Sequence, residues 1–167
     1  MAKKKKKQAP KEDGPKLILN NRKIGHDYEI LDSWECGLVL QGSEVKSLRN
    51  NDVQWAGTHA RLDKNKMEMW LYDLHIGEYT QASVFNHEPT RPRKMLLKKR
   101  ELIKIAALLR TKGLTLVPKQ LYFLKGYAKV VICLVRGKKH QDKRGDLKKR
   151  SQDREVNREM ARRQRGF

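Results

Sequence analysis

The sequence is short of cysteines, of long apolar runs and of acidic residues, and each shortage narrows the class of protein. Its 167 residues hold two cysteines, Cys36 and Cys133, too few for a disulfide framework. Both lie in apolar stretches, so we expect buried, reduced thiols rather than a metal site, which would need about four ligands at short spacing. No apolar run reaches the roughly 18 residues of a membrane-spanning helix, and no apolar stretch follows the first lysines as in a secretory signal. We therefore expect a cytoplasmic protein without metal or other cofactor.

The shortage of acidic residues points to a partner. Asp and Glu number 19 against 39 Lys and Arg, so the formal net charge is +20. This excess repels itself in a compact monomer, which favours a polyanionic partner. Nucleic acid fits best, because each phosphate contact releases a counterion, and a membrane surface is the rival. The charge is uneven: residues 1–23 carry a net +7, residues 24–135 a net +5 and residues 136–167 a net +8. The two ends are therefore typical of polybasic arms around a folded middle.

Alternating apolar residues predict the first strands. The alternation favours a strand over Tyr28–Leu40 with a bulge at Gly37, then strands over Thr58–Leu62 and Met67–Ile76 joined by a turn. Within Met67–Ile76 both parities are partly apolar, which predicts a strand covered on both faces.

Two helices and one irregular stretch follow from the same sequence. Ser43 is a predicted cap for a short helix that ends at Arg49. Apolar stripes predict a long helix over Arg93–Lys112, whose first two turns hold five cations. Cations there oppose the helix dipole, so a nearby polyanion is indicated. Residues 77–92 show no period, and a connection of this length is usually functional or disordered.

The last strands complete a mainly β pattern. Thr115–Leu124 and Tyr127–Val135 form a predicted hairpin, with an edge or a bulge at Pro118. Five or six antiparallel strands with one short and one long helix suit a small antiparallel barrel of the oligonucleotide-binding (OB) type, although the pattern alone allows other arrangements.

Three parts are predicted along the chain. Residues 1–19 form a disordered basic N-terminal arm, because they cannot bury enough apolar surface to offset their ordering entropy. Residues 20–135 form the OB-like, RNA-binding barrel. Residues 136–167 form a basic C-terminal tail with few large apolar groups and many helix formers. Such a helix is marginal alone in water, so we expect the tail to be disordered when free and helical when bound to RNA.

Several fragments resemble the SmpB family. They are Asn21-Arg22-Lys23 with His26-Asp27-Tyr28, Gly42-Ser43-Glu44-Val45-Lys46-Ser47-Leu48-Arg49, Asn86-His87-Glu88-Pro89-Thr90-Arg91, Arg93-Lys94-Met95-Leu96-Leu97, Leu116-Val117-Pro118 with Leu121-Tyr122-Phe123, and the run from Gly137 to Arg150. The resemblance covers roughly residues 20–160 in the family's order, so it is specific even though each fragment alone is weak.

The resemblance implies a non-enzymatic RNA-binding factor of ribosome rescue. It implies that the barrel binds the tRNA-like domain of tmRNA (SsrA RNA) and delivers it to the A site of a stalled ribosome, which allows tagging of the nascent chain and release. The tail would occupy the empty decoding centre and mRNA channel. It also implies a monomer in a 1:1 complex with tmRNA, elongation factor Tu as a further partner, and no role at a membrane.

The resemblance also assigns residues. Its tmRNA-contacting positions fall on Tyr28, Glu35, Leu96, Lys98 and Lys129. Its ribosome-binding tail positions fall on Lys138, Lys139, His140, Gln141, Asp142, Lys143 and Arg144. Physically, a carboxylate such as Glu35 can accept hydrogen bonds from a base amino group or a 2′-hydroxyl, and a tyrosine such as Tyr28 can stack on a base. Lys143 and Arg144 would neutralise rRNA phosphates, with Asp142 near the start of the induced helix.

Each of these residues also has an interpretation that involves no RNA. Glu35 also fits a solvated strand carboxylate, Tyr28 a core tyrosine, and Lys98 and Lys129 solvated or snorkelling lysines. Leu96 lies beside the main helical stripe and fits either RNA or core. The run around Asp142 fits a solvated charged face.

Two positions depart from the family pattern. Gln141 stands where many members have His or an aromatic before the Asp-Lys-Arg triplet, and His140 lies one residue earlier. His59 stands where tyrosine is frequent. The exact base contacts at these positions therefore stay open.

Two other classes of protein remain to be separated from this one. A constitutive basic ribosomal protein shares the arms and the small barrel. An RNA-cleaving enzyme would need a base, but none of the five histidines has a recognisable partner at motif spacing, and no phosphate loop appears. Catalysis is therefore not expected.

Overall fold

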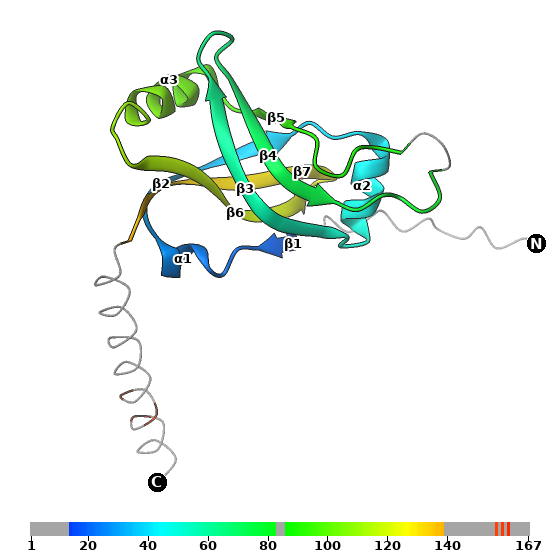
Figure 1. Cartoon of the computed structure of the whole chain (residues 1–167). Coiled ribbons are helices and arrows are strands. Elements are labelled where there is room, and N and C mark those ends of the chain that lie inside the picture. Colours follow the sequence, from blue (N-terminus) through cyan, green and yellow to red (C-terminus); the bar gives the residue numbers. More distant parts are fainter. Residues whose placement is uncertain (1–13, 83–85, 139–155, 157, 159, 161–167) are drawn as a thin grey trace, which may run out of the picture.

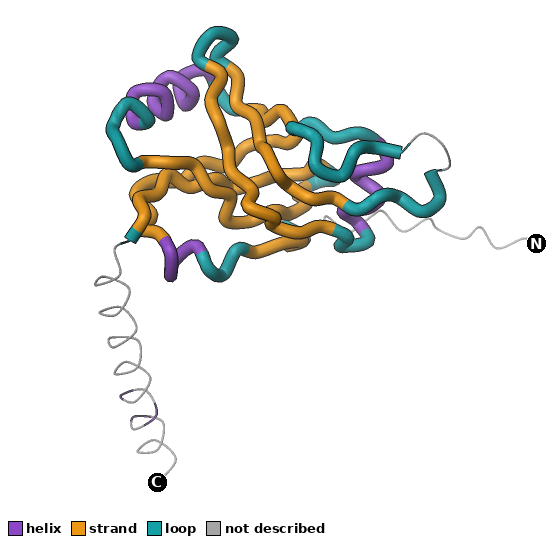
Figure 2. The backbone as a smooth tube through the Cα atoms, viewed as in Figure 1, coloured by secondary structure: helices purple, strands orange, loops and turns teal. Residues whose placement is uncertain are grey.

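The computed structural model describes residues 14–82 and 86–138 together with Val156, Arg158 and Met160. Seven strands and three helices lie in the first two of these ranges (Figures 1 and 2). In chain order they are β1 (Lys16–Asn20), α1 (Ile24–Asp27), β2 (Tyr28–Leu38), α2 (Gly42–Arg49), β3 (Val53–Asp63), β4 (Glu68–Ile76), β5 (Arg93–Leu96), α3 (Lys99–Leu108), β6 (Leu114–Leu124) and β7 (Tyr127–Gly137).

The strands close into an antiparallel barrel. Their order is β1-β6-β3-β4-β5-β2-β7, and β6 pairs again with β7, so six strands form a ring while β1 lies outside it on β6. All pairings are antiparallel. Figure 1 shows α2 and α3 near opposite ends of the barrel. The predicted fold class, a mainly β antiparallel barrel, is confirmed.

The folded body extends further at both ends than the barrel predicted over residues 20–135. Lys16–Asn20 pairs with β6, although these residues fall mostly in the predicted disordered arm. Ile18 and Leu19 pack against the core, so this short apolar run offsets the entropic cost of ordering β1 itself. At the other end β7 continues to Gly137, where it pairs with Tyr28. Residues 1–13 and most of the tail lie outside the described residues; Val156, Arg158 and Met160 are helical and exposed.

The predicted helix over Arg93–Lys112 is wrong in its first third. Arg93 and Met95 are buried while Lys94 and Leu96 are not, which is the period of a strand. This segment is β5, which bridges β4 and β2. The helix α3 begins only at Lys99, and the Glu101 carboxylate accepts the backbone N–H of Lys98 at 2.9 Å. Two of the five cations assigned to the helix start are therefore strand residues.

Local irregularities also differ from the predictions. The irregularity in β2 lies between Ile30 and Asp32 rather than at Gly37, whereas the predicted bulge at Pro118 is confirmed by a register shift there. The cap of α2 is not Ser43: the helix starts at Gly42, and Glu44 accepts the backbone N–H of Gln41 at 2.6 Å.

The parity of β4 switches within the strand. Met69 and Leu71 are fully buried, and so are Leu74 and Ile76, because Asp73 between them has a positive φ of 56°. This switch explains why apolar residues occupy both alternating sets of positions in β4. The prediction that β4 is covered on both faces is therefore wrong. Cys36 and Cys133 are free and buried, as predicted.

Candidate nucleic-acid interface

A groove about 540 Å³ in volume brings together four of the five predicted RNA-contacting residues. We call it the β2–β5 groove. Its lining comes from β2, β5, the start of α3 and β7: Ser33, Trp34, Glu35, Gly37, Leu96, Leu97, Lys98, Glu101 and Lys129. Because β2 pairs with β5 on one side and β7 on the other, Glu35 meets Leu96 and Lys129, which follow it by 61 and 94 positions.

Glu35 is the electrostatic centre of the β2–β5 groove. It lies on the outer face of β2, between the buried Trp34 and Cys36. The Lys129 ammonium donates to Glu35 Oε1 at 2.7 Å, and the Tyr122 hydroxyl donates to Oε2. The hydrogen bonds from Lys129 and Tyr122 hold the pKa of Glu35 below its ordinary value. The carboxylate is therefore charged at neutral pH and, being half exposed, retains acceptor capacity for a ligand.

Tyr122 is a groove neighbour that the sequence analysis did not assign. It lies opposite Lys129 in the β6–β7 hairpin. Burial, followed by its hydrogen bond to Glu35, raises the pKa of Tyr122 to about 12. The phenol thus keeps its proton and fixes the orientation of the carboxylate. The hairpin register would have placed Tyr122 beside Lys129.

Leu96 and Lys98 form the other side of the β2–β5 groove. Leu96 ends β5, pairs with Gly37 and exposes 56% of its surface. Lys98 is exposed at the N-terminus of α3. The sequence left open whether Leu96 faces RNA or the core, and the structure exposes it, on a strand rather than on a helix.

Tyr28 lies apart from these four residues. It begins β2, seven positions before Glu35, a separation of roughly 23 Å at about 3.3 Å per strand residue. It lines a second groove with Asn21, Arg22 and Lys23. The structure therefore offers two candidate contact areas rather than one.

Only Lys138 of the predicted tail positions is described. Its backbone N–H donates to the Asp27 carbonyl at 3.1 Å, and its ammonium donates to the Gly25 carbonyl at 3.0 Å. These contacts attach the start of the tail to α1, beside Tyr28. Lys139, His140, Gln141, Asp142, Lys143 and Arg144 lie outside the described residues.

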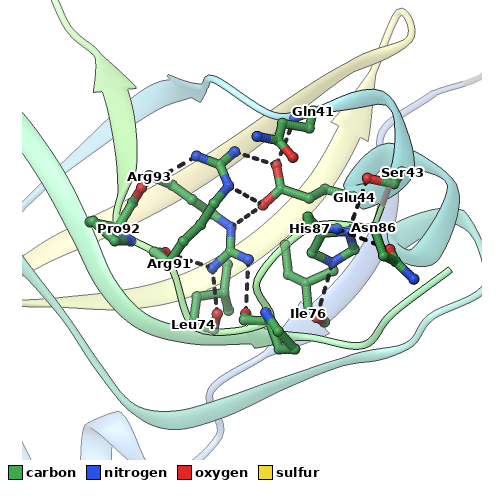
Figure 3. A network of polar contacts seen from close by, with 11 residues as sticks. Gln41, Ser43, Glu44, Leu74, Ile76, Asn86, His87, Arg91, Pro92 and Arg93 are labelled. Carbon is green, nitrogen blue, oxygen red and sulfur yellow. Dashed lines mark hydrogen bonds and ion pairs between the residues drawn. The ribbon is translucent and has the colours of Figure 1, made fainter. Parts of the chain in front are cut away.

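A buried ion-pair network fixes β5 beside the β2–β5 groove (Figure 3). The Glu44 carboxylate accepts hydrogen bonds from Arg91 and Arg93, and Arg93 also donates to the carbonyls of Leu74 and Pro89. Both Glu44 and Arg93 are fully buried.

The same network orders the second half of the connection between β4 and β5. The His87 ring bridges Ser43 Oγ (3.0 Å) and the Ile76 carbonyl (3.2 Å). Residues 86–92, part of the stretch without a period, therefore have a structural task.

The described residues show neither a membrane-spanning helix nor a metal-binding cluster. No helix there combines the length and apolar character needed to cross a bilayer. Nor do the described residues gather three or more His, Cys, Asp or Glu side chains into a group that could hold a metal ion.

The fold and the β2–β5 groove define a small antiparallel barrel protein of the oligonucleotide-binding type, with a groove in which carboxylates, lysines and an exposed leucine meet. The SmpB protein family profile matches residues 18–162, and the chain belongs to this family.

Close relatives cover nearly the whole chain. The SsrA-binding protein of Corynebacterium urealyticum is 46% identical over 98% of this chain and 90% of its own length. Those of Enterococcus faecalis and Thermobifida fusca are 47% and 48% identical, over 90% and 95% of this chain and 96% and 98% of their own lengths. A solved structure described as "tmRNA-SmpB: a journey to the center of the bacterial ribosome" holds a chain that is 47% identical, with a TM-score of 0.61 over 73% of this chain and 85% of that one.

Proposed function

We propose that this protein binds the tRNA-like domain of tmRNA and brings it to stalled ribosomes, without catalysing a reaction. The observation that carries the proposal is the β2–β5 groove, where an oriented carboxylate, two lysines and an exposed leucine converge. Membership of the SmpB family and the name SsrA-binding protein of its relatives support the choice of RNA.

Each groove residue has a separate task in this proposal. Lys98 and Lys129 contact phosphates, which adds affinity without reading sequence. Glu35 accepts hydrogen bonds from a 2′-hydroxyl or a base amino group, which distinguishes RNA from DNA. Leu96 covers an apolar ribose or base surface and excludes water. Because Lys129 and Tyr122 already fix the Glu35 carboxylate, little ordering cost remains when RNA binds.

The tail completes the proposed function on the ribosome. Lys138, Lys139, His140, Gln141, Asp142, Lys143 and Arg144 occupy the decoding centre and the mRNA channel that a truncated message leaves empty. The protein acts as a monomer in a 1:1 complex with tmRNA, in the cytoplasm, with elongation factor Tu carrying the charged tmRNA. No cofactor takes part.

Equilibrium binding to the isolated tRNA-like domain tests this proposal. Glu35→Ala should weaken binding by at least tenfold, because RNA donors lose their acceptor and Lys129 loses its partner. The matched control is Glu68→Ala, which removes a partly exposed carboxylate that is likewise paired with a lysine, Lys94, outside the groove. Equal affinity of both variants and the unaltered protein would refute the groove as the tmRNA site.

Sedimentation with ribosomes separates the proposal from a constitutive ribosomal protein. A rescue factor should be substoichiometric and enriched on stalled ribosomes. A ribosomal protein should be present at one copy per subunit whatever the state of translation.

A further inference from the structure

The second groove lies where the wall of the barrel is incomplete. The strands β3 and β6 share a single paired position, Ala60 with Leu116. Beyond it β1 takes over the edge of β6, with Asn20 opposite Gln120, and β3 diverges. The space left, about 630 Å³, is lined by residues of β1, the β1–α1 connection, the end of α1, the start of β2, β3 and β6. We call it the β1–β3 groove.

Beside apolar residues, threonines and one carboxylate, Asp27, the lining of the β1–β3 groove combines three kinds of side chain that suit RNA. Its aromatic rings are Tyr28, Trp55 and His59. Its amides, which can both donate and accept, are Asn20, Asn21 and Gln54. Its cations are Arg22 and Lys23, both exposed. Rings suit stacking, amides suit the edge of a base, and cations suit its phosphates.

The Trp55 side chain carries a buried hydrogen-bond donor that lacks an acceptor among the described residues. One part of its side chain packs against the main core, but its indole Nε1 is buried and has no partner among the described residues. Burying such a donor without a partner is unfavourable, so an acceptor that reaches it after a small movement of the surrounding side chains would stabilise the bound state. This observation, independent of the groove's shape, marks the place as incomplete.

His59 is held in position at the same groove. Its ring stacks on Tyr72, with centroids 5.7 Å apart and planes inclined by 18°. Its Nδ1 lies 3.3 Å from the Gly57 carbonyl and 3.3 Å from Asp73 Oδ2. Between Trp55 and His59 the register with β4 shifts, and Gly57 has a φ of 75°. The bulge thus turns this part of β3 relative to its partner, as bulges beside binding sites often do.

We propose that the β1–β3 groove holds an unpaired base of the RNA that the β2–β5 groove grips, with Trp55 and His59 as stacking residues and Arg22 and Lys23 on the adjoining phosphates. The identity of that RNA rests on the proposed function. Tyr28, the one predicted tmRNA contact outside the β2–β5 groove, lines this second groove. A base bound here must be unpaired, because rings can enclose a base only when it has left its stack.

The three tryptophans of the chain test both sites at once. Trp34 lines the β2–β5 groove, Trp55 the β1–β3 groove, and Trp70 a third pocket between β3, β4 and the β4–β5 connection. Indole N–H resonances can be recorded on the full-length protein labelled with nitrogen-15 and assigned by single Trp→Phe variants. Titration with the tRNA-like domain should shift the Trp34 and Trp55 signals and leave the Trp70 signal in place.

The outcomes separate the two proposals. A shift of Trp34 with a Trp55 shift no larger than that of Trp70 would overturn the base pocket and leave the β2–β5 groove intact. A silent Trp34 would count against the proposed function itself. A Trp55 shift seen with vacant ribosomal subunits, but not with the tRNA-like domain, would overturn the assignment to the same RNA.

Binding affinity provides a second test, and two separate variants keep it decisive even if one of them fails to fold. His59→Ala and Arg22→Ala each alter a side chain that is not fully buried. We expect His59→Ala to weaken binding of the tRNA-like domain about tenfold, and Arg22→Ala to reduce its salt dependence. The matched control for the arginine is Lys64→Ala, an exposed cation in the β3–β4 turn outside both linings. Unchanged affinity in both groove variants would contradict the pocket.

Discussion

Arg93 Nε donates to Glu44 Oε1 at 2.8 Å, and neither side chain has any exposed surface. This pair joins α2 to the first residue of β5, 49 positions later in the chain. Since β5 ends at Leu96 and leads into Lys98, the pair holds one side of the β2–β5 groove at a fixed place in the barrel.

Removing the acid should therefore be costly. Glu44→Ala leaves two arginines without their partner, one of them fully buried, and we expect a loss of about 3–5 kcal/mol in the free energy of unfolding. The surface variant Glu68→Ala should lose less than about 1 kcal/mol. Urea denaturation of both variants at pH 7 measures the difference. Similar losses of unfolding free energy in the two variants would show that the buried Glu44–Arg93 pair stabilises the fold no more than the surface pair does.

The same carboxyl predicts how stability changes with acid. Burial alone would raise the pKa of Glu44, but hydrogen bonds from Arg91 and the Gln41 backbone, with the charge of Arg93, outweigh it and hold the pKa below its ordinary value of 4.5. A depressed folded pKa means that the stabilisation is complete above about 4.5 and disappears as pH falls through the folded pKa. Denaturation between pH 7 and pH 3 should show a steeper loss for the unaltered protein than for Glu44→Gln. Parallel curves would contradict this role.

Lys98 should act on RNA through charge alone. Lys98→Ala removes one phosphate contact at the exposed start of α3, so the slope of log affinity against log salt should fall by about one. Lys64→Ala, in the exposed β3–β4 turn outside both grooves, should leave the slope unchanged. Filter binding of the tRNA-like domain at several salt concentrations provides the slopes. An unchanged slope in Lys98→Ala would place the phosphates elsewhere.

Removing the tail should leave the barrel folded, but the boundary between them lies after Gly137 rather than after Val135. A chain cut after Val135 would lose Arg136 and Gly137, which pair with Glu29 and Tyr28 in the barrel. A chain cut after Lys138 keeps these pairs. It should retain its melting temperature and its affinity for the tRNA-like domain, but lose tagging on stalled ribosomes in a reconstituted translation assay. Loss of both binding and tagging would show that body and tail are not independent.

Local patterns predicted most strands, because one face of each is buried. The hairpin of β6 and β7 and the bulge at Pro118 were visible in this way. The strand β5 was not visible in this way and was assigned to the start of the long helix. Arg93 and Lys94 are both cations, and the sequence does not show which of them is buried. Only the distant Glu44 makes Arg93 a buried strand residue, whereas Lys94 stays at the surface beside Glu68. A partner 49 positions away leaves no local signal.

The candidate site was predictable only in part for a related reason. Resemblance to the SmpB family supplied Glu35, Leu96, Lys98 and Lys129, and the structure shows that they share one groove. Tyr122 escaped notice because its contribution depends on pairing opposite Lys129. The β1–β3 groove depends on where β3 parts from β6, a feature of the closed barrel that periodicity within single strands cannot reveal.

Ultraviolet crosslinking of the protein in growing cells, followed by sequencing of the recovered RNA, tests the central claim most directly. The account predicts that tmRNA dominates the crosslinks made by the barrel, with sites in its tRNA-like domain, and that Glu35→Ala depletes them relative to Glu68→Ala. Recovery of ribosomal RNA alone, at one protein per subunit and unaffected by Glu35→Ala, would contradict it.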